Sequence, residues 1–385
     1  MKLKISSLKA ITIILVIISH ITIIVPCKKK LIIFSQSRNR YSGNSRYLFE
    51  EIAKEKLNVF WLYSSKEQLK KIPVSFHSRC IKRNSFTGIV TAIRAEFAFI
   101  SHGSGDFGKL WHLIKNRNIT NLWHAIGIKY VGLLDKKLSE KDLAKHRREI
   151  KYYNTMIASS DIDKYLTAVC HGIDPKKVLL TGLPKSDQYI KRKKNHKSSR
   201  IKILYAPTFR DYEIDRSLFF RLSGYTEEKL ISMLDKNPDH NFYLRPHPND
   251  FISVSHAQHL EELTDGRVVN YSQEKHDDID ETLHEFDIII TDYSSIYIEP
   301  LLFDTPCIFI PFDIDKYQET RGLAYDYDLI TPGPKISKFE DLTFYLENID
   351  EIKTKWRSDR EHAKKIFHKY QDGNSCKRII KEIIK

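Results

Sequence analysis

Short apolar runs alternate with longer amphipathic stretches along most of the chain from Lys28 onward. In the first half the apolar runs are Leu31–Ser35, Val59–Tyr63, Phe97–Ser101, Thr120–Trp123, Thr155–Ala158 and Val178–Thr181. These runs are short and rich in β-branched and aromatic residues, which favours strands. The intervals have helical character, as at Tyr47–Lys56 and Lys141–Tyr152. Alternation of this kind predicts an α/β fold.

Ten consecutive residues without an apolar side chain, 191–200, interrupt this pattern. Such a run is typical of a linker. Apolar runs then resume at Ile201–Tyr205, Phe242–Arg245, Val268–Asn270, Ile288–Thr291 and Cys307–Ile310. We therefore predict an α/β domain over 28–190, a basic linker over 191–200, a second α/β domain over 201–350 and a basic helical segment over 351–385. Two such domains imply a cleft that the carboxyl ends of their strands face.

The N-terminal 27 residues carry a separate pattern. Lysines precede an almost unbroken apolar stretch, Ala10 to Val25, and three more lysines follow Pro26-Cys27. As a helix these residues reach roughly 24 Å, which is short of the ~30 Å hydrocarbon core of a bilayer. We expect residues 1–27 to form an uncleaved anchor helix that lies in or dips into the cytoplasmic leaflet, with lysines against acidic headgroups. A buried first helix of the domain is the alternative.

The composition indicates the charge of the binding partner. The 385 residues are 41% apolar, enough for two cores, and 63 Lys and Arg against 49 Asp and Glu give a net charge of +14. Such a charge favours anionic partners, such as nucleotides, phosphopolymers, nucleic acid or acidic lipids. The five cysteines are scattered without a Cys-x-x-Cys pair. This spacing argues against a disulfide framework or a zinc knuckle and indicates a reducing compartment.

The segment Thr291–Ser295 follows the apolar run Phe286–Ile290 and precedes a helix-like run, Ile296 to Phe303. A strand that turns directly into a helix leaves backbone N–H groups unpaired at the start of the helix. With the hydroxyls of Ser294 and Ser295 beside them, these groups can bind a phosphate. Ordinary helix caps are the alternative interpretation. The segment predicts a phosphorylated ligand.

Two histidines follow predicted strands. His124 comes directly after Trp123, where an accessible imidazole suits a general base that takes a proton from a hydroxyl. In the second domain His247 stands between two prolines and beside Arg245, which orients an imidazole and a guanidinium toward a diphosphate. A histidine bound to a backbone group and a rigid surface turn are the respective alternatives.

Two further segments carry polar groups after strands. In Tyr205–Asp211 the hydroxyl of Thr208 and the guanidinium of Arg210 can meet a phosphate, while Asp211 orients Arg210. The Asp-x-Asp at Asp313 could hold a metal, but the same spacing recurs at Asp161 and Asp326, so we predict no metal site.

A glycine-rich motif offers a different reading. Gly103–Gly108 matches the dinucleotide pattern G-x-G-x-x-G, but it lies mid-domain and no acidic residue ends a strand about 20 positions later. We interpret it as a flexible glycine loop near the cleft.

Taken together, these segments resemble the CDP-glycerol glycerophosphotransferase family of teichoic-acid and capsule polymer enzymes. The match covers the chain from Lys28 to about residue 345. It rests on Tyr41–Tyr47, Trp123-His124, Thr181–Asp187, Tyr205–Asp211, Arg245–Pro248, Thr291–Ser295 and Asp313–Gly322. In order and spacing these motifs are jointly specific, although each is weak alone.

The resemblance implies a GT-B type architecture, in which two Rossmann-like domains face a central cleft and the C-terminal one binds the CDP donor. It implies that His124 activates the acceptor hydroxyl and that His247 steadies the diphosphate. The full predicted site comprises the catalytic pair His124 and His247 and the donor-phosphate residues Thr208, Arg210, Arg245, Asp292, Ser294, Ser295 and Arg321, without a metal or cofactor. One departure is Ala125, where family members usually have Gly, which puts the acceptor class in doubt.

The expected activity is transfer of glycerol phosphate from CDP-glycerol to a hydroxyl of a lipid-linked saccharide or growing polymer, with release of CMP, at the cytoplasmic face of the cell membrane. A CDP-ribitol donor and a GT-B glycosyltransferase that uses a nucleotide-sugar are the enzymatic alternatives. A non-catalytic nucleic-acid or membrane-binding protein would cluster basic residues among aromatics. Here Lys and Arg are spread along the chain, and we expect no nucleic-acid partner.

Overall fold

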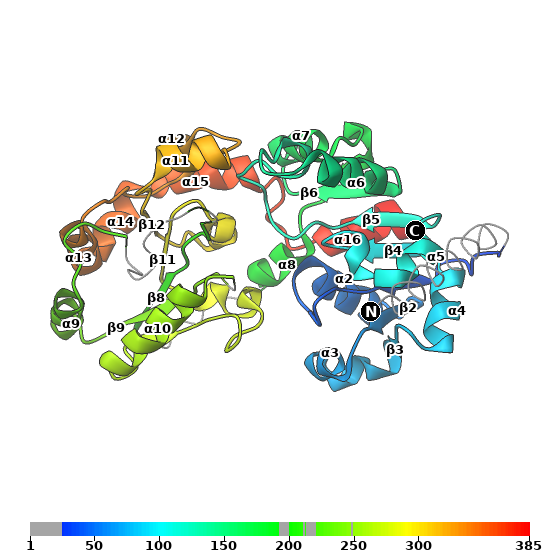
Figure 1. The fold of residues 1–385 in the computed structure, drawn as a ribbon, viewed down its shortest axis with the longest axis horizontal. Helices are drawn as coiled ribbons and strands as arrows, with labels where there is room; N and C mark the ends of the chain where they lie inside the picture. Colours follow the sequence, from blue (N-terminus) through cyan, green and yellow to red (C-terminus); the bar gives the residue numbers. More distant parts are fainter. Residues whose placement is uncertain (1–24, 192–199, 211, 213–220, 248) are drawn as a thin grey trace, which may run out of the picture. The chain divides into compact units, whose positions relative to one another are not determined.

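The computed structural model describes residues 25–191, 200–210, 212, 221–247 and 249–385. The chain divides into two compact units (Figure 1). Unit 1 contains the described residues up to Ala125 together with Leu138–Gln188 and Asp372–Lys385. Unit 2 contains Ile126–Lys137 and the described residues of Tyr189–Gln371.

Unit 1 is built on a parallel seven-stranded sheet with the strand order β3-β2-β1-β4-β5-β6-β7. The strands are β1 Ile32–Phe34, β2 Val59–Tyr63, β3 Cys80–Lys82, β4 Phe97–Ile100, β5 Asn118–Asn121, β6 Tyr153–Ala158 and β7 Val178–Leu180. The first six follow the order of a doubly wound Rossmann sheet, whose direction of winding reverses between β1 and β4.

Both faces of this sheet are buried, as expected for parallel strands. On one face Ile33, Leu62 and Ala98 belong to a large hydrophobic core. On the other, Phe34 stacks between Trp61 and Phe99, at centroid distances of 6.1 and 4.9 Å. Because successive side chains of a strand point to opposite faces, β1 serves both cores with three residues.

Most helices of unit 1 occupy the connections between its strands (Figure 1). The α-helices are α2 Gly43–Lys54, α3 Lys66–Lys71, α4 Phe86–Arg94, α5 Trp111–Ile114, α6 Glu140–Ile150, α7 Asp161–His171, α8 Pro184–Lys191 and α16 Ser375–Ile379. Helix α8, which extends into unit 2, and helix α16 follow the last strand of unit 1. Short 3-10 turns lie at η1 Val74–Arg79, η2 Ser104–Asp106, η3 Gly108–Leu110 and η5 Pro175–Lys177, and a π-helical turn, η10 Ile380–Ile384, ends the chain.

Unit 2 repeats the design with a parallel five-stranded sheet in the order β10-β9-β8-β11-β12. The strands are β8 Ile201–Tyr205, β9 His240–Leu244, β10 Val268–Asn270, β11 Ile288–Thr291 and β12 Cys307–Phe309. Winding reverses between β8 and β11. In open α/β sheets ligands bind at such a switch point, beyond the carboxyl ends of the strands.

The helices of unit 2 are again mostly connections between strands. The α-helices are α9 Glu227–Lys236, α10 Phe251–Leu263, α11 Ile314–Thr320, α12 Tyr327–Ile330, α13 Phe339–Glu347, α14 Ile349–Lys355 and α15 Arg357–Phe367. The 3-10 turns are η4 Gly132–Leu134, η6 Ile279–Glu281, η7 Leu283–Glu285, η8 Ser295–Tyr297 and η9 Glu299–Phe303.

A short segment from the middle of the first predicted domain, Ile126–Lys137, packs within unit 2. Its backbone pairs with the residues after α11: Tyr130 N donates to Gly322 O at 3.3 Å, and Ala324 N donates to Ile128 O at 3.0 Å. Lys129 and Leu323 form an antiparallel bridge between these bonds. The polypeptide thus passes from unit 1 to unit 2 directly after Ala125.

The predicted α/β fold is confirmed, with two parallel sheets in the described part of the chain. Four strands, β2, β8, β10 and β11, have the predicted bounds, and the other predicted strands overlap those observed. Strand β3, Cys80–Lys82, was not predicted, because it is short, only half-buried and ends in a lysine.

The helix-like run Ile296 to Phe303 does not form an α-helix. Two 3-10 turns, η8 and η9, take its place. Pro300 lies inside the run, has no N–H to donate and clashes with the carbonyl one turn earlier. A regular helix starting at Ser295 is therefore interrupted, and only single turns follow β11.

The predicted anchor, residues 1–27, lies almost entirely outside the described residues, as do most of the linker, Asp211 and Pro248. Within the described residues, every helix falls short of the length and apolarity needed to cross a bilayer.

The C-terminal residues return to unit 1 through a buried carboxylate. Asp187 is 1% exposed, and its two oxygens accept hydrogen bonds from the backbone N–H groups of Ser375 and Cys376, both at 2.8 Å. These are orphan donors at the start of α16, which no carbonyl of that helix can satisfy. Asp187 therefore anchors the last helix to α8.

We expect Asp187→Ala to lower the free energy of unfolding by about 2–4 kcal/mol, because two buried N–H groups lose a charged acceptor. Hydrogen exchange should accelerate at the amides of Ser375 and Cys376. Asp350→Ala is the matched control, since Asp350 pairs with Lys353 on an exposed surface, and it should change stability by under about 0.5 kcal/mol. Unchanged exchange at these amides in Asp187→Ala would contradict the anchoring role.

Candidate functional site

Five of the predicted phosphate residues of unit 2, Thr208, Arg210, Asp292, Ser294 and Ser295, lie in the two loops at its switch point. Residues 206–210 follow β8 and residues 292–295 follow β11, and these strands are neighbours in the sheet. The two loops are joined directly: Ala206 N donates to Ile290 O at 3.0 Å, and Thr291 Oγ1 donates to Ala206 O at 2.7 Å. Sequence reasoning thus placed both loops at one sheet edge.

Asp292 is the centre of this region and is 3% exposed. Its carboxylate accepts hydrogen bonds from Thr208 N at 2.9 Å and from Arg210 Nη1 at 2.8 Å. The backbone N–H of Tyr293 donates to it as well. Asp292 therefore fixes the loop after β8 against the loop after β11.

Arg210 is buried in the same cluster. Its guanidinium forms a bidentate pair with Asp313, in which Nε and Nη2 each donate at 2.8 Å, in addition to its bond with Asp292. Aromatic rings of Tyr293, Phe312 and Tyr317 surround it, with centroids 4.8 to 5.1 Å from Cζ. Arg210 also holds the pKa of Asp313 below its usual value. With all three nitrogens engaged, Arg210 is suited to shape the site rather than to contact a phosphate.

Four predicted residues line one small cavity of about 20 Å³: Thr208, Arg210, His247 and Asp292. The imidazole of His247 is exposed and stacks on Phe209 at 5.2 Å, and its Nδ1 accepts a hydrogen bond from Asn249 N at 3.2 Å. Sequence reasoning did not find Arg221, which also lines this cavity. The structure therefore brings the histidine after β9 to the loop after β8.

The remaining donor-phosphate candidates have other contacts. Arg245 donates to the carbonyl oxygens of Tyr271 and His276, at 3.0 and 2.5 Å, and thereby supports the loop after β10. The hydroxyl of Ser294 accepts from Ile296 N at 3.3 Å, and Ser295 begins η8; both serines are half-buried.

Arg321 lies after α11. It pairs with Asp135 at 3.1 Å and keeps 34% of its side chain exposed. Its partner belongs to the segment Ile126–Lys137 described above, so Arg321 holds that segment while its exposed side remains accessible to an anion.

In unit 1, His124 follows β5 at a strained turn. Trp123 adopts a left-handed conformation with φ of 51°, which is unfavourable for a bulky residue. Its N–H donates to Asn121 Oδ1 at 2.8 Å, and its carbonyl accepts from Asn44 Nδ2 at 3.1 Å. The surrounding structure thus enforces the turn that presents His124.

Asn44 joins three parts of unit 1 and is 1% exposed. Its Nδ2 also donates to Leu122 O at 3.0 Å, and its Oδ1 accepts from Lys185 N at 3.2 Å. Asn44 lies within the sequence segment 41–47 already noted, but no sequence pattern assigned it a role. Its contacts make it a positioning residue for the His124 turn.

The imidazole of His124 stacks on that of His102, with centroids 4.8 Å apart and planes 9° from parallel. His124 has an exposed edge, yet the surrounding protein lowers its pKa below the ordinary value, and the nearby His102 and Lys185 lower it further. The pKa of His102 is also lowered, to about 4, by burial and by Arg40. Both rings are therefore neutral near pH 7, the state in which an imidazole can accept a proton.

The structure shows the backbone at two positions that the sequence analysis noted, Ala125 and the Gly103–Gly108 loop. Ala125 does not have a positive φ, so the methyl group in place of the usual glycine causes no backbone strain. The start of the Gly103–Gly108 loop is hydrogen-bonded to α6: Ser104 N and Oγ both donate to Glu149, and a Cβ on Gly103 would lie 2.5 Å from Glu149 Oε1.

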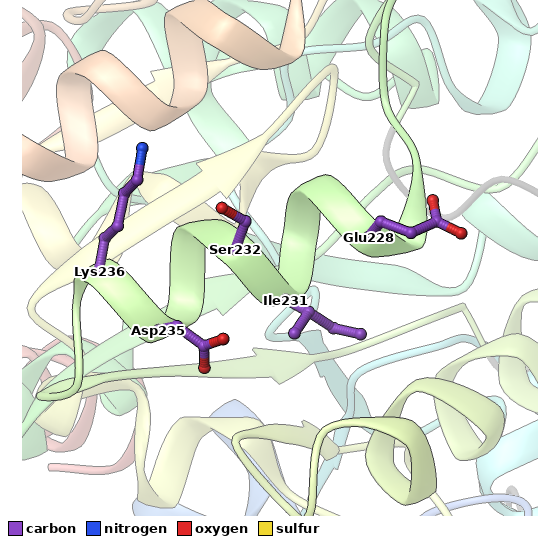
Figure 2. A pocket seen from close by; sticks show the side chains of 5 residues that line it. All are labelled: Glu228, Ile231, Ser232, Asp235 and Lys236. Atoms are coloured by element: carbon purple, nitrogen blue, oxygen red, sulfur yellow. The ribbon is translucent and has the colours of Figure 1, made fainter.

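Other possible sites are less promising. Across the described residues no group of three or more His, Cys, Asp or Glu side chains could hold a metal ion. A shallow hollow of about 510 Å³ lies on the outer face of α9 (Figure 2), lined by Glu228, Ile231, Ser232, Asp235 and Lys236. It contains none of the predicted residues, and its side chains point to the surface without converging on a ligand position.

Comparison with known proteins identifies what the chain is similar to. A family model described as CDP-glycerol:poly(glycerophosphate) glycerophosphotransferase matches residues 17–385. The teichoic acid ribitol-phosphate polymerases TarK and TarL of Staphylococcus aureus are 28% and 27% identical, over 93% and 91% of this chain and 69% and 61% of their own lengths. The teichoic acid glycerol-phosphate primase of Bacillus subtilis is 28% identical over 69% of this chain and 68% of its own. The chain thus spans about two thirds of the length of these relatives.

The fold is that of a solved relative. The wall teichoic acid polymerase TagF superposes with a TM-score of 0.71 at 21% identity, over 92% of this chain and 88% of that one. A variant of TagF soaked with CDPG has the same TM-score, at 20% identity over the same shares of the two chains. This likeness supports the predicted two-domain class of fold.

We expect Arg210→Met to lower the free energy of unfolding by about 3–5 kcal/mol, because it leaves the buried Asp292 and Asp313 without their cation. Urea unfolding measures the change. Lys229→Met is the control, since Lys229 forms an exposed pair with Glu340 and should contribute under about 1 kcal/mol. Equal losses in the two variants would contradict the structural role of Arg210.

Proposed function

The chain belongs to the CDP-glycerol:poly(glycerophosphate) glycerophosphotransferase family and is thus an enzyme of the transferase class, and on that premise we propose that it transfers glycerol phosphate from CDP-glycerol. The acceptor is a hydroxyl of a lipid-linked saccharide or of a growing polyol-phosphate polymer in teichoic-acid-like synthesis. The observation that carries the proposal is the pair of strand-end sites: a neutral, exposed histidine in unit 1 and a phosphate-type switch-point site in unit 2.

The reaction needs one base and a preorganised place for the phosphates. His124 takes the proton of the acceptor hydroxyl, whose oxygen attacks the phosphorus that bears glycerol. A new P–O bond forms there, the bond to the bridging oxygen breaks in line, and CMP leaves with that oxygen. The proton on His124 passes to solvent, and no covalent enzyme intermediate forms.

Residues of unit 2 are proposed to meet the charge of the diphosphate. His247 and Thr208 line the switch-point cavity, and Arg321 and the N–H groups near Ser294 and Ser295 add positive potential. Of these groups, Thr208 is held in place by Asp292, which accepts from its backbone N–H. We propose that both histidines serve the same transfer, His124 as the base and His247 at the diphosphate.

A ribitol donor is the second candidate. TarK and TarL are named ribitol-phosphate polymerases, whereas the primase is named for glycerol phosphate. The CDP part of both donors is identical, so the same cavity residues would serve either one. A nucleotide-sugar glycosyltransferase would release a nucleoside diphosphate in place of CMP.

We propose that the enzyme works at the cytoplasmic face of the cell membrane, where a lipid-linked acceptor is presented. The net charge of +14 favours an acidic membrane surface. Incubating purified protein with CDP-glycerol, CDP-ribitol and lipid-linked acceptors tests the function. CMP release with a matching mass gain in the acceptor supports it, and release of CDP or no transfer overturns it.

We expect His124→Ala to reduce turnover at least about 10²-fold while CDP-glycerol still binds, because a general base typically contributes 10²–10⁴-fold. His362→Ala is the matched control, as His362 is exposed on α15. CMP release measures turnover, and calorimetry measures donor binding. Wild-type turnover in His124→Ala would remove this residue from the chemistry.

The lowered pKa of His124 predicts that kcat/KM declines only at an unusually low pH. A histidine of ordinary pKa, about 6.5, would lose its base function as the pH falls through that value. Because His124 stays neutral to lower pH, we expect kcat/KM to hold steady from pH 7.5 down to below 6. An acid limb centred at or above pH 6.5, with the fold intact by circular dichroism, would contradict this environment.

A further inference from the structure

Lys129 is a cation that no sequence motif singled out. It lies in the segment Ile126–Lys137, five residues after His124, and its backbone is fixed by the bridge to Leu323. Its side chain is half-buried, and Nζ donates to Thr208 Oγ1 at 3.4 Å. The ammonium also lies over the ring of Tyr317, 5.6 Å from the centroid. These contacts direct it toward the loop after β8.

The ammonium is incompletely satisfied. It has three donors, and one long hydrogen bond to a neutral hydroxyl uses only one of them. Throughout the described residues, no carboxylate forms an ion pair with it. The carboxylate that acts on it most strongly, Asp292, is already bonded to Arg210 and Thr208. A partly buried cation without an ion pair is costly, and a bound anion would remove that cost.

We propose that Lys129 Nζ binds a phosphate oxygen of the donor, next to the hydroxyl of Thr208. This inference rests on the proposed function and adds a residue to the donor side of the site. A diphosphate oxygen would supply the missing acceptor, and the charge-assisted bond would be stronger than the present one to Thr208. Arg321 lies close enough to act on the same charge.

The groups around Lys129 give the contact a pH signature. Burial lowers the pKa of Lys129 to about 8, Asp292 opposes that shift, and Arg210 and Arg321 reinforce it. Above pH 8 an unliganded Lys129 therefore loses its proton and its attraction for phosphate. Donor affinity should then fall as pH rises from 7.5 to 9.5, whereas an arginine at this position would remain charged.

The alternative is that Lys129 serves only to balance the charge of Asp292 and Asp313 around Arg210. That role predicts a loss of stability without a loss of donor affinity. The two roles are separated by measuring both quantities in the same variants. Lys136→Met is the matched control, because Lys136 belongs to the same segment, is exposed and donates to Gln318 O at 3.5 Å.

The experiment measures the Kd of CDP-glycerol by calorimetry, without acceptor, for the unaltered protein, Lys129→Met, Lys129→Arg and Lys136→Met. We expect Lys129→Met to weaken binding about 10- to 100-fold at pH 7.5, the range for loss of one charge-assisted bond. Lys136→Met should bind like the unaltered protein. Lys129→Arg should bind more tightly than Lys129→Met and lack the alkaline decline.

The results separate the phosphate contact of Lys129 from the proposed function of the enzyme. If Lys129→Met binds CDP-glycerol as tightly as the unaltered protein, whatever its melting temperature, the inference is wrong while the proposed function stands. If the unaltered protein itself does not bind CDP-glycerol, the proposed function fails and the inference fails with it. Weakened binding in Lys129→Met at an unchanged melting temperature supports the phosphate contact.

Discussion

A buried carboxylate is tolerated only when its charge is paired and its oxygens are hydrogen-bonded, and the switch-point region of unit 2 is built around one that meets both conditions. Asp292 joins the loops after β8 and β11 by accepting from Thr208 N, Arg210 and Tyr293 N. Without Asp292, these contacts between the two loops would be lost. Because Arg210 continues the network to Asp313, the residues after β12 are held as well. Asp292 and Arg210, which are engaged with each other, thus position the neighbouring loop that carries the hydroxyl of Thr208.

The same parallel-sheet topology creates both reactive regions but leaves them with different electrostatics. In unit 2 the switch point between β8 and β11 places the hydroxyl of Thr208 and the imidazole of His247 beside Arg210, which is paired with Asp292. In unit 1 the loop after β5 carries His124, whose pKa is lowered mainly by the surrounding protein and further by His102 and Lys185. In the proposed function, the edge of the sheet in unit 2 meets the charge of the diphosphate, and His124 at the edge of the sheet in unit 1 accepts the proton.

Local sequence predicted the elements well, because buried parallel strands are short apolar runs that periodicity can find. It also placed Thr208, His247 and Asp292 after the correct strands, since polar residues at strand ends are visible in one dimension. It could not predict contacts set by tertiary structure, such as the pairing of Arg210 with Asp313 over 103 positions. For the same reason it missed Asn44, whose partners Trp123 and Lys185 are 79 and 141 residues away, and Lys129, which carries no recognisable pattern.

The environment of His124 bears on how a weak base can serve the proposed transfer. Lowering the pKa of an imidazole keeps it unprotonated but also weakens its pull on a proton. In phosphoryl transfer through a loose transition state, the attacking oxygen forms little bond before the leaving group departs, so the base needs correct orientation more than strength. Orientation is what the surroundings of His124 supply: Asn44 and Asn121 fix the backbone of Trp123, and His102 stacks on the ring. The left-handed conformation of Trp123 is unfavourable, and the surrounding hydrogen bonds maintain it. In the proposed mechanism, this strain is the cost of a fixed position for the imidazole of His124.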